Sequence, residues 1–233
     1  MFLFWTITAL AKKLMQDKKG ELTPTGLWAS IGAGIVGAMA ACFADSIWFS
    51  AVEGEVYAMS LFFTAIVFWA IIKWDEVATT KNADRWIILI AFLMGLSTGV
   101  HLLNLLTIPA IAVVYYNKRY VPTLRGQIIA FLIGGLLLAF VQFGIIQQLP
   151  SIAAFFDRMF VNSMGMAKNT GSILFLFMLS IGLGIGLFFT HRSPKQVYHT
   201  ALLAITFIII GYSSVLMVPI RSLADPPIDM NNP

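Results

Sequence analysis

The stretch from Phe43 to Tyr57, FADSIWFSAVEGEVY, contains the residues best suited to chemistry, and it holds no basic residue. Three of the chain's 11 acidic residues lie in it: Asp45, Glu53 and Glu55. Two strongly apolar runs flank it, so the stretch lies at a membrane edge if those runs cross a bilayer. Trp48 and Tyr57 would then lie at the headgroup level, where amphipathic aromatic side chains settle.

A carboxylate at such an edge has several possible uses. Partial desolvation can make it a general base, and it can also bind a metal ion or a sugar hydroxyl. In a continuous helix, Glu53 and Glu55 would point about 200° apart, which predicts different roles for them. The structural alternative is a solvated loop that keeps two helix ends apart.

Two further polar residues, His101 and Asn104, interrupt a strongly apolar run. Polar groups in lipid are costly unless they face a cavity or a partner, so both a functional site and an interhelical hydrogen bond fit them. Arg221 lies four residues before Asp225 and can hold a phosphate through paired hydrogen bonds, or it can snorkel or form a local ion pair.

Metal chemistry has little support in the sequence. His191 and His199 lie near one turn without a carboxylate or cysteine pattern, and the only cysteine is Cys42. No metal site and no cofactor are expected, although a divalent ion at the acidic stretch remains an open alternative.

Composition indicates a membrane protein. Hydrophobic residues make up 59% of the 233 residues and charged residues only 11%. The apolar runs of roughly 15 to 22 residues suit helices that cross a hydrocarbon core about 30 Å thick. The net charge of +4 does not indicate nucleic-acid binding, because the basic residues are dispersed. The expected fold is therefore all-α: one polytopic helical bundle over residues 1–233, with the lipid bilayer as its partner.

The apolar runs predict about six full spans or hairpin limbs. Full spans are expected over residues 27–44, 58–72, 128–149, 172–190 and 200–218. Residues 1–11 predict a partial span, because a helix of that length covers only about 16 Å. Residues 87–116 predict a short hairpin with its tip near Gly99, His101 and Asn104. Residues 150–171 predict an outer loop with amphipathic character.

Glycines recur in two of these spans. Gly32, Gly34 and Gly37 formally match a dinucleotide-binding fingerprint, but polar, turn-like residues precede them where that motif needs a strand. Small residues in a membrane helix more simply allow a neighbouring helix to approach closely. The same interpretation applies to Gly182, Gly184 and Gly186.

The distribution of lysine and arginine predicts the topology. Twelve of the 15 basic residues fall in segments on one side of the proposed spans. The other three are Arg158, Lys168 and Arg221. By the positive-inside rule the lysine-rich side is cytoplasmic, so residues 45–57 face away from the cytoplasm.

Three runs resemble one known family: WFSAVEGEVYAMSLFFTAIVFWAIIKW, ADRWIILIAFLMGLSTGVHLLNLLTIPAIAVVYY and PIRSLADPPIDMNNP. They are similar to bacterial multi-pass membrane proteins described as a domain of unknown function and common in Bacteroidota. That family is related to the animal endoplasmic-reticulum O-mannosyltransferase that modifies plexin and receptor-kinase extracellular domains, within the GT-C glycosyltransferase superfamily.

The resemblance implies an inverting transferase in the bacterial inner membrane that takes mannose from a polyprenyl-phosphate donor. The acceptor would be a hydroxyl of a protein or glycan on the periplasmic side. Glu55 and Tyr57 match the family's Glu-Val-Tyr motif, His101 and Asn104 its hairpin tip, and Arg221 its later outer motif. The implied roles are acceptor or sugar binding for Glu55, positioning for His101 and phosphate binding for Arg221. Other residues implied in substrate binding are Asp45, Trp48, Glu53, Tyr57 and Asn104.

One departure from the family pattern affects these roles. Family members begin with a further helix and an outer loop that carries the expected acidic base, and they continue past the proline-rich tail. We therefore expect this chain to be an internal fragment whose main catalytic base lies outside it. A non-enzymatic transporter or accessory subunit for lipid-linked glycans is the alternative. It would move labelled lipid without forming a glycosidic bond.

Overall fold

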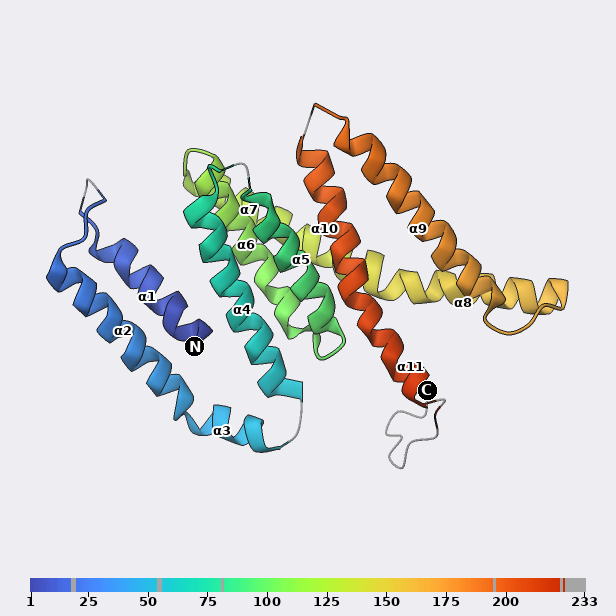
Figure 1. Ribbon diagram of the computed structural model, residues 1–233, viewed down its shortest axis with the longest axis horizontal. Coiled ribbons are helices and arrows are strands. Elements are labelled where there is room, and N and C mark those ends of the chain that lie inside the picture. The colour runs from blue at the N-terminus through green and yellow to red at the C-terminus, as the bar shows by residue number, and fades with distance from the viewer. Residues whose placement is uncertain (18–19, 54–55, 81, 195, 223, 225–233) are drawn as a thin grey trace. The chain divides into compact units, whose positions relative to one another are not determined.

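The computed structural model describes the chain except residues 18–19, 54–55, 81, 195, 223 and 225–233. Every regular element in the described part is helical, which confirms the all-α prediction (Figure 1). Two compact units divide the chain, Met1–Thr107 and Ile108–Pro233. The single domain expected over residues 1–233 stays a prediction.

The first unit is built around one long helix, α4. Its elements are α1 (Phe2–Met15), α2 (Pro24–Cys42), α3 (Asp45–Val52), α4 (Val56–Val77), α5 (Asp84–Thr98) and the 3-10 helix η1 (Leu102–Thr107). Helix α1 packs along α2, and α4 contacts α1, α5 and η1. Val67, Ala70 and Trp74 of α4 are completely buried, so the core of this unit lies along that helix.

Helix α2 begins at Pro24, three residues before the span expected from residue 27. Thr23 is the N-cap, and its Oγ1 accepts a hydrogen bond from the Gly26 amide at 3.0 Å. Pro24 follows at the first helical position, where a missing N–H costs nothing. Further along, a Cβ on Gly34 would lie 2.0 Å from Thr8 Oγ1, and one on Gly37 would lie 2.6 Å from Ile7 Cδ1. These two glycines therefore allow the close packing of α1, as predicted, whereas Gly32 has no neighbour within 4 Å.

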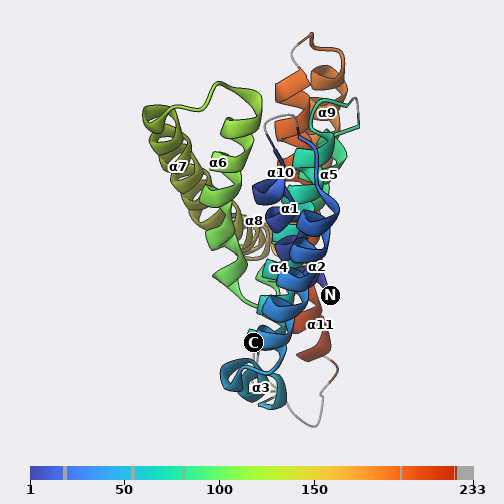
Figure 2. The same ribbon diagram turned by 90° about the vertical axis from the view of Figure 1, so that its left-hand side faces the viewer.

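The second unit contains one helical pair and one group of three helices. Its elements are α6 (Ile108–Arg119), α7 (Leu124–Ala139), the π-helical segment η2 (Phe140–Gln147), α8 (Gln148–Met164), α9 (Thr170–His191), α10 (Gln196–Tyr212), the 3-10 helix η3 (Ser213–Leu216) and α11 (Met217–Ser222). Helices α6 and α7 run side by side (Figure 2). Helix α9 contacts both α8 and α10, and α8 lies across the direction of α9 (Figure 1).

The outer loop expected over residues 150–171 is wrong for most of its length. Helix α8 continues to Met164 and ends at Gly165, which adopts the left-handed conformation that favours glycine. The reason is the packing of its apolar face against α9. The Phe156 and Phe175 rings lie 5.6 Å apart, and a Cβ on Gly171 would meet the Phe156 carbonyl oxygen at 2.3 Å.

Helix length and apolar composition confirm a multi-pass membrane protein. Among the described residues, five helical stretches are long and apolar enough to cross a membrane. They are Pro24–Cys42, Val56–Val77, Leu124–Met164, Thr170–His191 and Gln196–Ser222. Each includes or overlaps one of the five full spans predicted from the sequence. Helices α1, α5 and α6 have 14, 15 and 12 residues, so each rises only about 18 to 23 Å.

Candidate functional site

The candidate site lies at one end of the first unit and is formed by three segments. Helix α3, the start of α4 and the turn after α5 lie at this end of the unit (Figure 1). Helix α3 contacts α4, and η1 contacts both α4 and α5. The fold thus brings most of the sequence-predicted residues, which span residues 45 to 104, to one end of the unit.

Tyr57 and His101 form the central contact. Their ring centroids lie 5.6 Å apart with an interplanar angle of 50°, and Tyr57 is 45% exposed. His101 Nδ1 accepts a hydrogen bond from the Leu103 amide at 3.1 Å. A neutral imidazole that accepts at Nδ1 carries its proton at Nε2. This arrangement makes His101 Nε2–H a donor for a phosphate or hydroxyl oxygen.

Asn104 belongs to a buried network beneath this turn. The side chain is fully buried, and its Nδ2 donates to Ser97 Oγ at 3.1 Å. Ser97 Oγ in turn donates to the Met94 carbonyl at 2.8 Å, and Thr107 Oγ1 donates to the Asn104 carbonyl at 2.7 Å. These bonds tie the end of α5 to η1, so Asn104 fixes the backbone that presents His101.

Two buried polar atoms near this network have no hydrogen-bond partner among the described residues. They are Asn104 Oδ1 in η1 and Ser60 Oγ in α4, on elements that contact each other. Buried polar atoms are usually satisfied by protein or ordered water, so both atoms are available to accept a hydrogen bond. Sequence reasoning identified Asn104 but missed Ser60, Ser97 and Thr107, because isolated serine and threonine residues in apolar helices give no distinctive pattern.

Helix α3 presents the acidic stretch to solvent. Asp45 lies in its first turn, where a carboxylate is favoured by the helix dipole, and Glu53 is its C-cap. Trp48 is 55% exposed, and both carboxylates are exposed. The helix ends at Val52, so Trp48 and Tyr57 do not belong to one continuous helix. Glu55 lies outside the described residues.

The remaining sequence-predicted positions belong to the second unit. Arg221 is exposed in the last turn of α11, whereas Asp225, Pro226 and Pro227 lie outside the described residues. The rings of His191 and His199 are 5.1 Å apart, and Thr190 Oγ1 lies 3.1 Å from His199 Nδ1. Among the described residues, no three histidine, cysteine, aspartate or glutamate side chains lie together as a metal site would require.

These features define a multi-pass helical membrane protein. The family described as the protein O-mannosyl-transferase TMEM260 N-terminal domain matches residues 1–124, and the chain belongs to this family. No curated protein and no solved structure matches the chain. The matched residues include the whole first unit and therefore every candidate site residue except Arg221.

Proposed function

We propose that this chain forms the membrane core of a protein O-mannosyltransferase. The donor is a polyprenyl-phosphate mannose, and the acceptor is a hydroxyl of a protein or glycan. The family match over residues 1–124 is the observation that carries this proposal, because it covers the unit that holds α3 and the contact of Tyr57 with His101. The distribution of lysine and arginine, read with the positive-inside rule, supports a site on the extracytoplasmic side, which is the periplasmic face in our proposal of a bacterial inner-membrane protein.

The proposed reaction is a single displacement with inversion. A carboxylate removes the proton from the acceptor hydroxyl, and the oxygen attacks the anomeric carbon of mannose. The bond from that carbon to the phosphate oxygen breaks as the new glycosidic bond forms. Polyprenyl phosphate leaves with the bonding electron pair, and the carboxylate keeps the proton.

The site residues have distinct proposed roles. Glu55 binds the acceptor or the sugar, and the exposed carboxylates Asp45 and Glu53 hydrogen-bond sugar hydroxyls. His101 donates its Nε2 proton to a phosphate or hydroxyl oxygen, which suits a positioning role because Nδ1 is engaged by the Leu103 amide.

Aromatic rings and one arginine complete the assignment. Trp48 and Tyr57 offer exposed rings against which the apolar face of a sugar can pack. Asn104 holds the turn that carries His101. Arg221 binds the phosphate of the donor as a fixed positive charge.

The test is transfer by the full-length protein in membranes supplied with radiolabelled polyprenyl-phosphate mannose and a fraction of secreted proteins. Glu55→Gln keeps the size of the side chain and removes its charge, so label in protein should fall to background while the amount of inserted protein is unchanged. Glu21→Gln is the matched control, because Glu21 is an exposed glutamate in the segment between α1 and α2.

Two results would count against the proposal. Unaltered transfer by Glu55→Gln would remove Glu55 from the site. Movement of labelled donor across vesicles without any label in protein would identify a transporter for lipid-linked glycans instead.

A further inference from the structure

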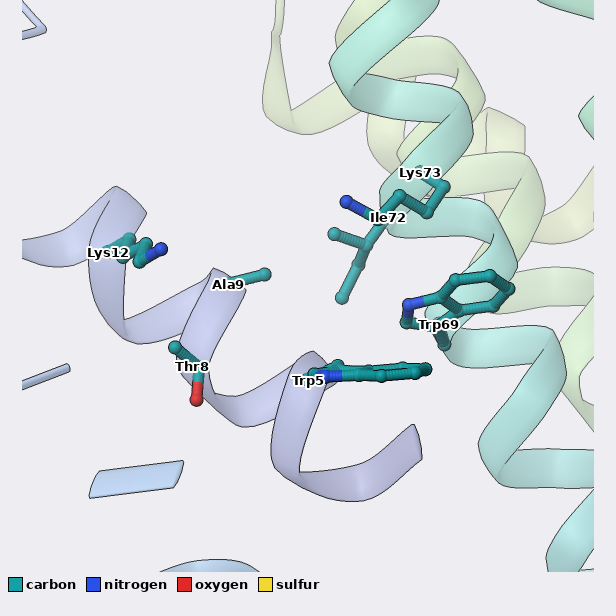
Figure 3. Close-up of a pocket in the computed structure, with 7 residues that line it drawn as sticks. All are labelled: Trp5, Thr8, Ala9, Lys12, Trp69, Ile72 and Lys73. Carbon is teal, nitrogen blue, oxygen red and sulfur yellow. The ribbon is translucent and has the colours of Figure 1, made fainter. Parts of the chain in front are cut away.

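The first unit has a cavity toward the opposite end from the candidate site. It has a volume of about 290 Å³ and lies between α1 and α4 (Figure 3). Seven residues line it: Trp5, Thr8, Ala9, Lys12, Trp69, Ile72 and Lys73. Two cations and two indoles in one small cavity form a combination that neither the family match nor the proposed reaction explains.

The cations enter the cavity from two different helices. Figure 3 shows the Lys12 and Lys73 side chains extending toward the same space from α1 and α4. Lys73 Nζ is 2.8 Å from Glu76 Oε2, in a pair of half-exposed side chains. No hydrogen bond or ion pair is found for Lys12 among the described residues, whereas the adjacent Lys13 pairs with Asp75. The cavity therefore carries a net positive charge that an anion would neutralise.

The indoles form the apolar side of the same cavity. The Trp5 and Trp69 ring centroids are 5.7 Å apart, and Trp69 also lies 5.5 Å from Trp86. Lys12 is seven residues beyond Trp5 in α1, and Lys73 is four residues beyond Trp69 in α4. At 1.5 Å per residue, the ammonium-bearing positions lie about 6 to 10 Å along the helices from the indoles.

This gradient of polarity matches the boundary of a lipid leaflet. Lysines at the ends of membrane helices lie at the headgroups, and tryptophans lie at the interface just below them. A lipid phosphate can contact the two ammonium groups while the start of its acyl chains covers the indoles. An inorganic phosphate would engage only the lysines and leave the aromatic surface bare.

We propose that this cavity binds the phosphate of an anionic glycerophospholipid from the leaflet on the lysine-rich side. Lys12 and Lys73 bind the phosphate, and Trp5 and Trp69 contact the lipid chains. The bound lipid joins α1 to α4, two helices that also meet through the contact of Phe2 with Trp69 and the ion pair of Lys13 with Asp75. This site is separate from the mannosyl-transfer site and does not rest on the proposed function.

The experiment measures lipid retention by native mass spectrometry of the full-length protein released from nanodiscs. The nanodiscs contain phosphatidylcholine with a minor fraction of phosphatidylglycerol, and phosphatidylglycerol adducts are counted against its concentration. Each lysine near an anionic headgroup contributes on the order of fivefold in affinity, so Lys12→Gln with Lys73→Gln should weaken retention roughly 25-fold.

Two matched variants separate a specific site from general charge. Arg85→Gln with Arg125→Gln removes the same charge from two exposed positions and should leave retention within twofold. Lys12→Arg with Lys73→Arg keeps both charges and should also retain the lipid. Thermal unfolding of each variant in phosphatidylcholine alone checks that the fold is intact.

Three results would overturn the proposal. Equal losses in the lysine and arginine variants would show a nonspecific charge effect. Retention that the lysine variant leaves unchanged would place the lipid elsewhere. Displacement of the lipid by millimolar inorganic phosphate would identify a free-phosphate site rather than a lipid site.

Discussion

The packing of α1 on α2 makes the sharpest stability prediction. A Cβ on Gly34 would lie 2.0 Å from Thr8 Oγ1 and 3.0 Å from Phe4 Cδ2, whereas a Cβ on Gly32 would meet nothing within 4 Å. Real Cβ atoms stay beyond 3.0 Å from such neighbours, so Gly34→Ala requires a local separation of about 1 Å. Thr8 is buried and β-branched, which leaves it little freedom to turn away.

The magnitude follows from two opposing effects. Inserting a methyl group into a close-packed contact costs about 1 to 3 kcal/mol. Replacing glycine by alanine inside a helix gains up to about 1 kcal/mol, and both glycines lie in α2. Gly32→Ala should therefore raise the free energy of unfolding slightly. The free energy of unfolding of Gly34→Ala should be lower than that of Gly32→Ala by the cost of the steric contact, about 1 to 3 kcal/mol.

The assay is unfolding in mixed micelles with increasing dodecyl sulfate, followed by tryptophan fluorescence. A second variant tests the cause: Thr8→Ala combined with Gly34→Ala should recover part of the loss, because Thr8 Oγ1 is the closest atom. Loss of the Thr8 hydroxyl should itself contribute little to the change in stability, since this group is buried without a hydrogen-bond partner among the described residues. Equal unfolding free energies for Gly32→Ala and Gly34→Ala would refute the proposed contact between these helices.

Two further predictions concern hydrogen bonds. Ser97→Ala removes the acceptor of the buried Asn104 amide and should destabilise the protein by about 1 to 3 kcal/mol. The control Ser50→Ala should change stability by less than about 0.5 kcal/mol, and similar unfolding midpoints for the two variants would contradict the prediction. Thr23→Ala and Thr123→Ala each remove an N-cap oxygen that lies 3.0 to 3.1 Å from a glycine amide nitrogen. Each variant should lower the free energy of unfolding by about 1 kcal/mol in the same assay, and an unchanged free energy in both would count against the capping bonds.

Much of the fold follows from helix length and apolar composition. A run of about 20 apolar residues crosses a bilayer as a helix, because its backbone polar groups must form hydrogen bonds within the segment. The cap at Thr23 was equally predictable, since its signal is local. The prediction over residues 150–171 was wrong because an amphipathic helix and a loop both contain mixed polar and apolar residues. The two are distinguished only by the neighbouring helix that the apolar face packs against.

Glycine packing shows the same limit. Gly186 would place a Cβ 2.9 Å from Leu202 Cδ2, but Gly182 and Gly184 have no neighbour within 4 Å among the described residues. The spacing of glycines identifies a helix that a neighbour can approach closely. It does not identify which face of that helix contacts the neighbour. The π-helical turn over Phe140–Gln147 also has no simple sequence signal.

The candidate site was predictable as a set of residue types but not as a geometry. The acidic stretch and the polar residues His101 and Asn104 are conspicuous because charges and amides are rare in an apolar chain. The contact of His101 with Tyr57 joins residues 44 positions apart, which only the packing of η1 on α4 provides. The complete burial of Asn104 could not be read from the sequence, and it favours the positioning role that we propose over direct contact with a ligand.

The most direct measurement of the central claim is the glycosylation of extracytoplasmic proteins in cells that carry or lack the full-length gene. Mass spectrometry of their peptides should find single hexoses on serine or threonine that disappear with the gene. Wild-type protein should restore them, and Glu55→Gln should not. Hexose-modified peptides that persist unchanged in cells lacking the gene, or that Glu55→Gln restores fully, would contradict a mannosyltransferase built on this site.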